Sequence, residues 1–194
     1  DCPARWEAKH LLGMTMPMGG AAALGKAVHA STAVFDQSTI DHAGITIDEA
    51  AAAAVDSIHR PDEDVVWEED WKPTTVEGIA LALHGRYCRD IAPQQTYRAV
   101  EVRCDSLEIV DLGIALTGTV DRLHVNDAGN GITDLKTGKT AVAADGTVST
   151  KGHAYQLGVY ELLAHAASGI EISAPAQIIG MQTGKTEKAQ RIAI

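Results

Sequence analysis

The chain has 194 residues, of which 45% are hydrophobic and 22% charged, and its formal net charge is −10 at pH 7. This composition excludes a disordered tail, a collagen-like repeat and a small disulfide-stapled protein, and the length suits one domain, residues 1–194, with a sizeable core. No apolar run approaches the roughly 18 residues that a membrane-spanning helix needs, so no membrane partner is expected.

The amino-terminal half is predicted to be helical. An Ala-rich stretch over 20–40 carries apolar residues at helical spacing. A second helix is expected over 46–59, because Thr46 and Glu49 have the spacing of a capping box at its start. A third helix is expected over 73–91, since a proline and a threonine precede an apolar pattern of period near four.

The second half is predicted to form a sheet. β-Branched residues indicate strands, and an Asn-, Asp- and Gly-rich turn separates the second strand from the third. In chain order the expected elements are strands over 96–104, 114–125 and 132–136, a helix over 151–167, and strands over 176–181 and 189–194. The expected fold class is therefore α/β, with a mainly helical region, 1–95, beside a mixed central sheet, 96–194, that is flanked by helices.

Two carboxylates and a lysine lie on neighbouring predicted strands. Asp134 and Lys136 are two residues apart, so they project from one face of their strand, and a hairpin turn brings Asp121 alongside Asp134. Carboxylate oxygens suit Mg²⁺ or Mn²⁺, and a lysine beside them can stabilise charge that develops on a phosphate. The alternative interpretation is an ordinary exposed ion pair.

Five short motifs follow one another along residues 19–194. They are LGKAVH (24–29), YRAVEV (97–102), GTVDR (118–122), ITDLKTGK (132–139) and YQLGVY (155–160). In this order they resemble the motifs of the RecB-type branch of the PD-(D/E)XK nuclease superfamily. The resemblance implies a restriction-endonuclease-like fold and metal-dependent cleavage of DNA.

The resemblance also implies roles for single residues. Asp121 and Asp134 would be metal ligands together with the backbone carbonyl of Leu135, and Lys136 would be the catalytic lysine. His29 would be a further metal ligand, although a lone helical histidine is more often a plain surface or core residue. For the glutamate of the first strand, Glu101, two interpretations stay open: a contribution to the site, or an exposed strand residue.

Other residues are expected to contact the DNA. Gln156 and Tyr160 are four apart and share one helix face, which the resemblance implies to lie beside the active site; Tyr160 could instead pack into the core. Arg122, Lys139 and Lys151 are close in sequence to the site and could supply phosphate contacts. The net charge of −10 argues against a protein that coats DNA through bulk charge.

The number and spacing of the cysteines argue against a four-thiolate zinc site and against an iron–sulfur cluster. Cys2, Cys88 and Cys104 form no C-x-x-C pair, so neither a disulfide framework nor a four-thiolate zinc site is expected, and a reducing cytoplasm is the expected compartment. Some RecB-type relatives hold an iron–sulfur cluster with one upstream and three C-terminal cysteines. Cys2 has the upstream position, but no cysteine follows Cys104, so no iron–sulfur cluster is expected in this chain.

The resemblance thus implies a Mg²⁺- or Mn²⁺-dependent deoxyribonuclease, with exonuclease action favoured, in recombination, repair or phage DNA processing. A recombination or helicase partner would supply any unwinding, and the oligomeric state stays open. The main alternative is an inactive nuclease fold used for DNA binding or scaffolding, which the intact acidic positions and lysine oppose. The acidic run over 62–70 is interpreted as a surface loop, with a DNA-mimicking or partner-docking patch as the alternative.

Two further enzyme classes fit the sequence poorly. A P-loop needs a glycine five residues before its Gly-Lys-Thr, and neither Gly138-Lys139-Thr140 nor Gly184-Lys185-Thr186 has one. A zinc hydrolase of the H-E-x-x-H type finds no such motif among the eight scattered histidines.

Overall fold

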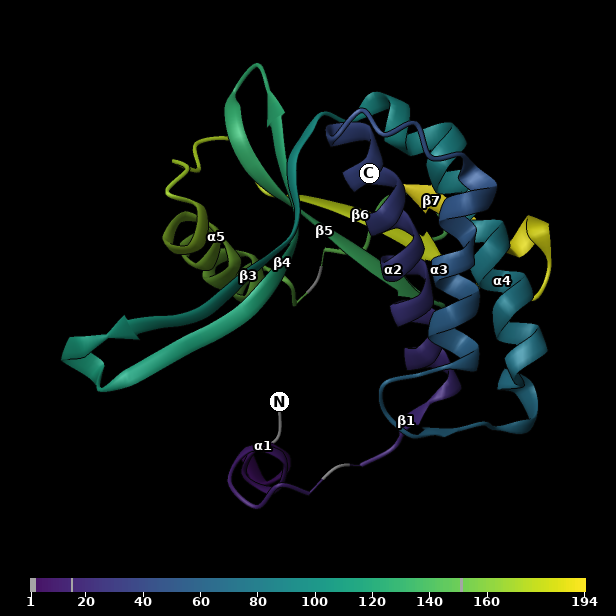
Figure 1. Ribbon diagram of the computed structural model, residues 1–194, viewed down its shortest axis with the longest axis horizontal. Helices are drawn as coiled ribbons and strands as arrows, with labels where there is room; N and C mark the ends of the chain where they lie inside the picture. Colours follow the sequence, from purple (N-terminus) through teal and green to yellow (C-terminus); the bar gives the residue numbers. More distant parts are fainter. Residues whose placement is uncertain (1–2, 15, 151) are drawn as a thin grey trace.

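A computed structural model describes residues 3–14, 16–150 and 152–194 (Figure 1). Two residues with expected roles, Cys2 and Lys151, lie outside these ranges. The chain starts with a short helix, α1 (Pro3–His10), followed by a strand, β1 (Met18–Gly19), that pairs in parallel with β2 (Val65–Val66). In the described ranges, no helix is both long and apolar enough to cross a membrane.

Three helices form one layer of the molecule: α2 (Gly20–Ile40), α3 (Ile47–His59) and α4 (Pro73–Arg86) (Figure 1). The predicted helix over 20–40 is confirmed, and so is the capping box, in which Thr46 and Glu49 each accept from the other's backbone N–H. The third helix differs from its prediction. After Arg86 the chain continues as a π-helical turn, η2 (Tyr87–Ile91), and then as η3 (Ala92–Gln94).

The second half of the described chain forms a five-stranded mixed sheet in the order β3-β4-β5-β6-β7. The strands are β3 (Tyr97–Ile109), β4 (Ile114–Asn126), β5 (Gly129–Gly138), β6 (Gln177–Gln182) and β7 (Arg191–Ala193). Within this sheet β5 and β6 pair in parallel and the other neighbours pair antiparallel, and α5 (Ala154–Ser168) makes the crossover between β5 and β6. The α/β fold class with a mixed central sheet is therefore confirmed.

The hairpin of β3 and β4 is longer than predicted. β3 continues past Cys104 to Ile109 through an irregular register, and a short turn, η4 (Val110–Leu112), joins it to β4. The two strands project from the body of the molecule in Figure 1. Asp105 and Ser106 interrupt the apolar alternation, which explains why the sequence pattern ended the strand too early.

Two hydrophobic clusters lie on opposite sides of the sheet. The first joins the helical layer to the middle of the sheet through Leu135, Ile179 and Met181. The second packs α5 against β3, β4 and β5, and includes Leu123 and Leu163. Because β5 contacts both clusters, its backbone is fixed between two packed layers, and this rigid strand carries Asp134, Leu135 and Lys136.

The surface segments agree with the remaining expectations. The residues of the acidic run over 62–70 are exposed or partly exposed, and they include β2 and a 3-10 turn, η1 (Glu69–Trp71). Gly138-Lys139-Thr140 leads into a loop that contains a single β-bridge, Val142 with Val148, and Gly184-Lys185-Thr186 leads into a three-residue turn, η5 (Glu187–Ala189). Neither segment therefore opens a helix, as a P-loop must.

Candidate active site

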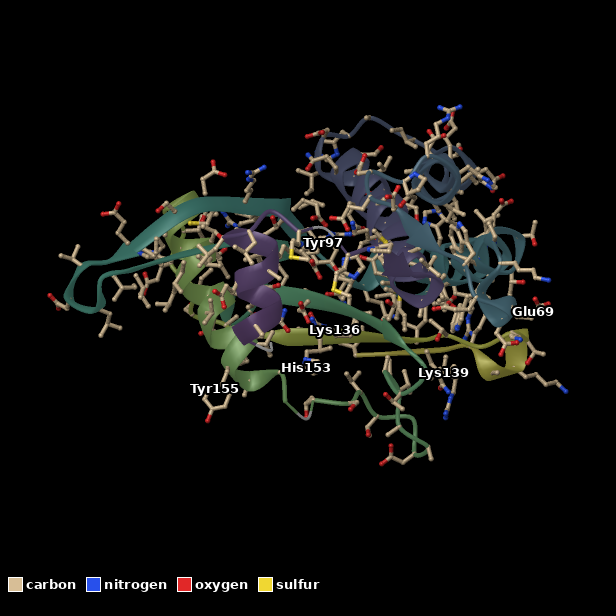
Figure 2. The ribbon with its side chains drawn as sticks, turned by 90° about the horizontal axis from the view of Figure 1, so that it is seen from below. Glu69, Tyr97, Lys136, Lys139, His153 and Tyr155 are labelled. Carbon is tan, nitrogen blue, oxygen red and sulfur yellow. The ribbon has the colours of Figure 1, made fainter. Side chains whose placement is uncertain are left out.

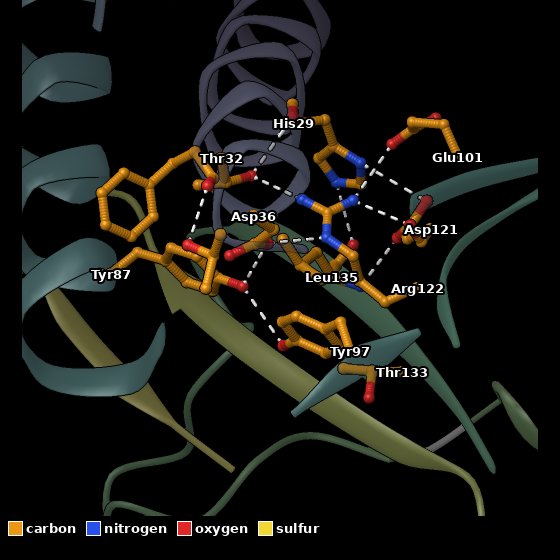
Figure 3. Close-up of polar contacts among 12 residues, drawn as sticks. His29, Thr32, Asp36, Tyr87, Tyr97, Glu101, Asp121, Arg122, Thr133 and Leu135 are labelled. Atoms are coloured by element: carbon orange, nitrogen blue, oxygen red, sulfur yellow. Dashed lines mark hydrogen bonds and ion pairs between the residues drawn. The ribbon is translucent and has the colours of Figure 1, made fainter. Parts of the chain in front are cut away.

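The site begins where α2 crosses β5. A Cβ on Gly25 would lie 2.9 Å from Thr137 Oγ1, so the helix approaches the strand more closely than a larger residue permits. His29 follows four residues later on the same helix face. Its Nε2 lies 3.0 Å from the backbone oxygen of Leu135, and since a carbonyl only accepts, Nε2 carries the hydrogen in this arrangement (Figure 3).

Asp121 fills a gap that opens between two strands. The ladder between β4 and β5 ends at the pair Arg122–Thr133, so the backbone of Leu135 has no partner on β4. The carboxylate of Asp121 takes that place: Oδ2 accepts the Leu135 N–H at 2.7 Å, and Oδ1 lies 3.5 Å from His29 Nδ1. Both backbone groups of Leu135 therefore face the site.

Glu101 comes to the same point from β3. Its backbone has φ of +51°, in the left-handed region that non-glycine residues seldom adopt. In the described part of the chain, His29, Glu101 and Asp121 form a group that could hold a metal ion, since one potential ligand atom from each lies within 4.8 Å of the others. The structure thus brings Glu101, whose role the sequence left open, beside two of the predicted metal ligands.

Asp134 and Lys136 form a pair next to this group. Lys136 Nζ lies 3.0 Å from Asp134 Oδ1 and 2.8 Å from Oδ2, and the aspartate is 2% exposed. Oδ2 is buried and receives no well-directed hydrogen bond. Such an oxygen is costly to bury without a further positive partner, which makes it suitable as a cation ligand.

The charges of the site perturb its titratable groups. Burial raises the pKa of Glu101, and the Asp121 carboxylate adds to this effect. Burial also raises the pKa of Asp134 despite its bond to Lys136. Burial alone would raise the pKa of Asp121, but the hydrogen bond and charge of His29 outweigh it and lower that pKa. Burial alone would lower the pKa of His29, but Asp121 outweighs it, so the pKa of His29 is raised.

The expected phosphate contact of Arg122 is wrong. Its side chain is fully buried and donates to Asp36, Thr32, Glu101 and the backbone oxygen of Asp121 (Figure 3). A guanidinium enclosed in this way has no surface to offer a phosphate. Sequence proximity to the site could not tell a buried arginine from an exposed one.

The other expected DNA contacts have different surroundings. Lys139 is exposed just after β5 (Figure 2). Its Nζ lies 5.8 Å from the ring centroid of Trp71. Gln156 Nε2 donates to Tyr160 Oη at 2.8 Å on α5, which agrees with the shared helix face. Tyr160 is partly buried and packs against the second hydrophobic cluster, as the core alternative anticipated.

Sequence reasoning missed the polar residues behind the site. Thr32 and Asp36 lie three and seven residues after His29, on the same face of α2. Asp36 is 2% exposed and accepts a 2.7 Å hydrogen bond from Tyr87 Oη, which in turn lies 3.2 Å from Tyr97 Oη. The signal was available: three polar residues at helical spacing in an otherwise Ala-rich helix.

A mixed sheet flanked by helices, with clustered carboxylates and a lysine where two strands diverge, defines a restriction-endonuclease-like fold. A family model described as the PD-(D/E)XK nuclease superfamily matches residues 1–193, and the chain belongs to this superfamily. A search of curated proteins found no match close enough to indicate a relative. Nucleases of this superfamily use divalent metal ions. The donor set agrees with that use, because it combines the grouped His29, Glu101 and Asp121 with a buried oxygen of Asp134 whose one close partner in the described residues is the Lys136 ammonium.

Proposed function

We propose that this nuclease is a Mg²⁺- or Mn²⁺-dependent deoxyribonuclease of the RecB type. The observation that carries the proposal is the convergence of His29, Glu101 and Asp121 within 4.8 Å, beside a strand that presents Lys136. The helical histidine is the feature that favours the RecB-type branch, because α2 brings it against the backbone of Leu135.

The proposed metal ligands come from three strands and one helix. His29, Glu101, Asp121 and the carbonyl of Leu135 lie together, and Asp134 adds its buried oxygen from the neighbouring position on β5. A divalent cation held there would supply Lewis acidity, which favours deprotonation of water and neutralises charge on a phosphate. The surplus of carboxylates over cations provides the negative field that attracts such an ion.

Lys136 has the central role among the chain's own groups. Its ammonium is held by Asp134 at the edge of the site and remains about one-quarter exposed. From there it can donate a hydrogen bond to a phosphate oxygen or orient the attacking water. The exposed amine of Lys139 and the amide of Gln156 are proposed to position the DNA, without taking part in proton transfer.

We further propose exonuclease action on DNA ends, in recombination, repair or phage DNA processing, with unwinding left to a helicase partner. These finer assignments rest on the RecB-type motifs. A cytoplasmic setting is proposed because Cys88 and Cys104 are free thiols.

The test is cleavage of end-labelled linear DNA and of covalently closed circular DNA, with Mg²⁺, Mn²⁺ or EDTA. We expect metal-dependent loss of the linear form alone, abolished in Lys136→Ala but retained in Lys188→Ala, which removes an exposed lysine on η5. Cutting of circles would keep the site and reject the exonuclease mode. A wild-type protein that binds DNA but cleaves neither substrate with any metal would favour the inactive binding role.

A further inference from the structure

One buried side chain connects the candidate metal ligands to the helical layer. Arg122 is 0% exposed, and it follows Asp121 directly in β4. Its guanidinium lies between β3, β4 and α2, at the centre of the polar contacts drawn in Figure 3. The established nuclease family and the proposed metal centre assign no role to it.

The guanidinium bonds to two of the candidate ligands at once. Nη1 donates to the side chain of Glu101 at 3.2 Å and to the backbone oxygen of Asp121 at 2.8 Å. A guanidinium is planar and presents its donors in a fixed fork, so these two contacts fix the carboxylate of one residue relative to the backbone of the other.

The opposite side of the guanidinium is fixed to α2. Nε donates to Asp36 at 2.7 Å and Nη2 donates to Thr32 at 3.1 Å. Asp36 is itself held by the hydroxyl of Tyr87. Since α2 also carries His29, the same helix positions one candidate ligand directly and two others through Arg122.

Glu101 depends most on this contact. Its side chain is 44% exposed and its backbone has φ of +51°, so neither packing nor an ordinary strand conformation holds its carboxylate near His29 and Asp121. The bond from Arg122 is an ion pair that comes from a completely buried donor. Such outer contacts are known to set the orientation, and therefore the affinity, of metal ligands.

We infer that Arg122 is a positioning residue of the metal centre. It holds the Glu101 carboxylate and the backbone of Asp121 in fixed positions relative to His29. The inference rests on the proposed function, because it requires that these residues bind a divalent ion. Arg122 acts through Glu101 and touches neither the ion nor the DNA. A lysine keeps the charge beside Asp36, but its single nitrogen cannot reach Asp36 and Thr32 on α2 while it also holds the two ligands.

The test is a double-mutant cycle read by Mn²⁺ binding, with free Mn²⁺ measured by its electron paramagnetic resonance signal. The proteins are the wild type, Arg122→Lys, Glu101→Gln and the double variant, each shown to be folded by circular dichroism at the temperature used. We expect Arg122→Lys to weaken Mn²⁺ binding about tenfold in the wild-type background and less than twofold in the Glu101→Gln background. No weakening, or equal weakening in both backgrounds, would overturn the inference.

Tyr87→Phe is the matched control, since it removes a hydrogen bond from Asp36 at the far end of the same contacts. It should lower thermal stability and leave Mn²⁺ affinity unchanged; an equal loss of affinity would mean that any damage to these contacts suffices, which contradicts a specific role. If Arg122→Lys does not fold, Thr32→Val enters the cycle in its place and is judged by the same criterion. A wild type that binds no Mn²⁺ would reject the proposed function and the inference together, whereas an unaltered affinity in the cycle rejects the inference alone.

Discussion

Gly25 on α2 and Thr137 on β5 lie so close that a Cβ on the glycine would be 2.9 Å from the threonine hydroxyl. This contact lies one helical turn before His29, whose Nε2 is 3.0 Å from the backbone oxygen of Leu135, so we expect it to determine how near the histidine comes to that strand. The close packing of a helix on a strand is thereby linked to the position of a candidate metal ligand.

Gly25→Ala should therefore weaken Mn²⁺ binding and lower stability, although alanine normally stabilises a helix interior by about 0.5–1 kcal/mol relative to glycine. The matched control is Gly78→Ala on α4, where no atom lies within 4 Å of the new Cβ and the normal gain is expected. Denaturant unfolding and Mn²⁺ titration give the two quantities.

Adding Thr137→Ala should restore the affinity of Gly25→Ala, because it removes the atom that the new methyl group meets. If the double variant stays as weak as the single one, the close approach of α2 to β5 is not what positions His29.

The packing of α5 on the sheet gives a second prediction. Leu163 is 1% exposed, and a Cβ added to Gly118 on β4 would lie 2.9 Å from its Cδ1. Leu163→Ala should cost about 2–5 kcal/mol of unfolding free energy, because it leaves a cavity against β4. Leu162→Ala, one residue away and 54% exposed, should change stability by less than about 0.5 kcal/mol. Similar losses in urea unfolding of both variants would contradict this packing.

Acid should weaken the fold through His84. This side chain is 1% exposed with Nε2 3.0 Å from the Ile47 carbonyl, and burial lowers its pKa below the usual value. The unfolded chain therefore takes up a proton at a higher pH than the folded one. The contribution of neutral His84 is fully present above the unfolded pKa of about 6.5 and is lost as the pH falls below it, by at most about 1.4 kcal/mol per pH unit.

The contribution of His84 to acid sensitivity can be measured from the unfolding free energies of the wild type and His84→Gln at pH 7.5 and 5.5. The wild type should lose more stability on acidification than the variant does. An identical loss in both proteins would show that His84 does not contribute to the acid sensitivity.

The helices could be predicted from the sequence where local signals determine them. The helix over 20–40 and the capped start at Thr46 depend on residues close in sequence, so alanine content and one capping box suffice. The change to a π-helical turn at Tyr87 could not be predicted in this way. It places the Tyr87 hydroxyl on Asp36, a contact between residues 51 positions apart.

The residues of the candidate site likewise fall into those that local sequence patterns could predict and those that depend on long-range contacts. Asp121, Asp134 and Lys136 lie on adjacent strands of one hairpin, so alternation and a turn signal brought them together in advance. The burial of Arg122 depends on Asp36, 86 residues away, and the position of Glu101 depends on a backbone φ that no pattern of side chains encodes. Long-range contacts thus decided which of the charged residues face the site and which support it.

The most direct test of the metal centre is isothermal titration calorimetry, in which Mn²⁺ is added to the wild-type protein and to Asp121→Asn. Asparagine keeps an acceptor for the Leu135 N–H, so the fold should survive while the charge between His29 and Glu101 is removed. Asp145→Asn, an exposed aspartate in the loop after β5, is the control for a lost carboxylate elsewhere. We predict saturable binding by the wild type and Asp145→Asn, and its loss in Asp121→Asn; equal binding by all three proteins would contradict a metal centre at His29, Glu101 and Asp121.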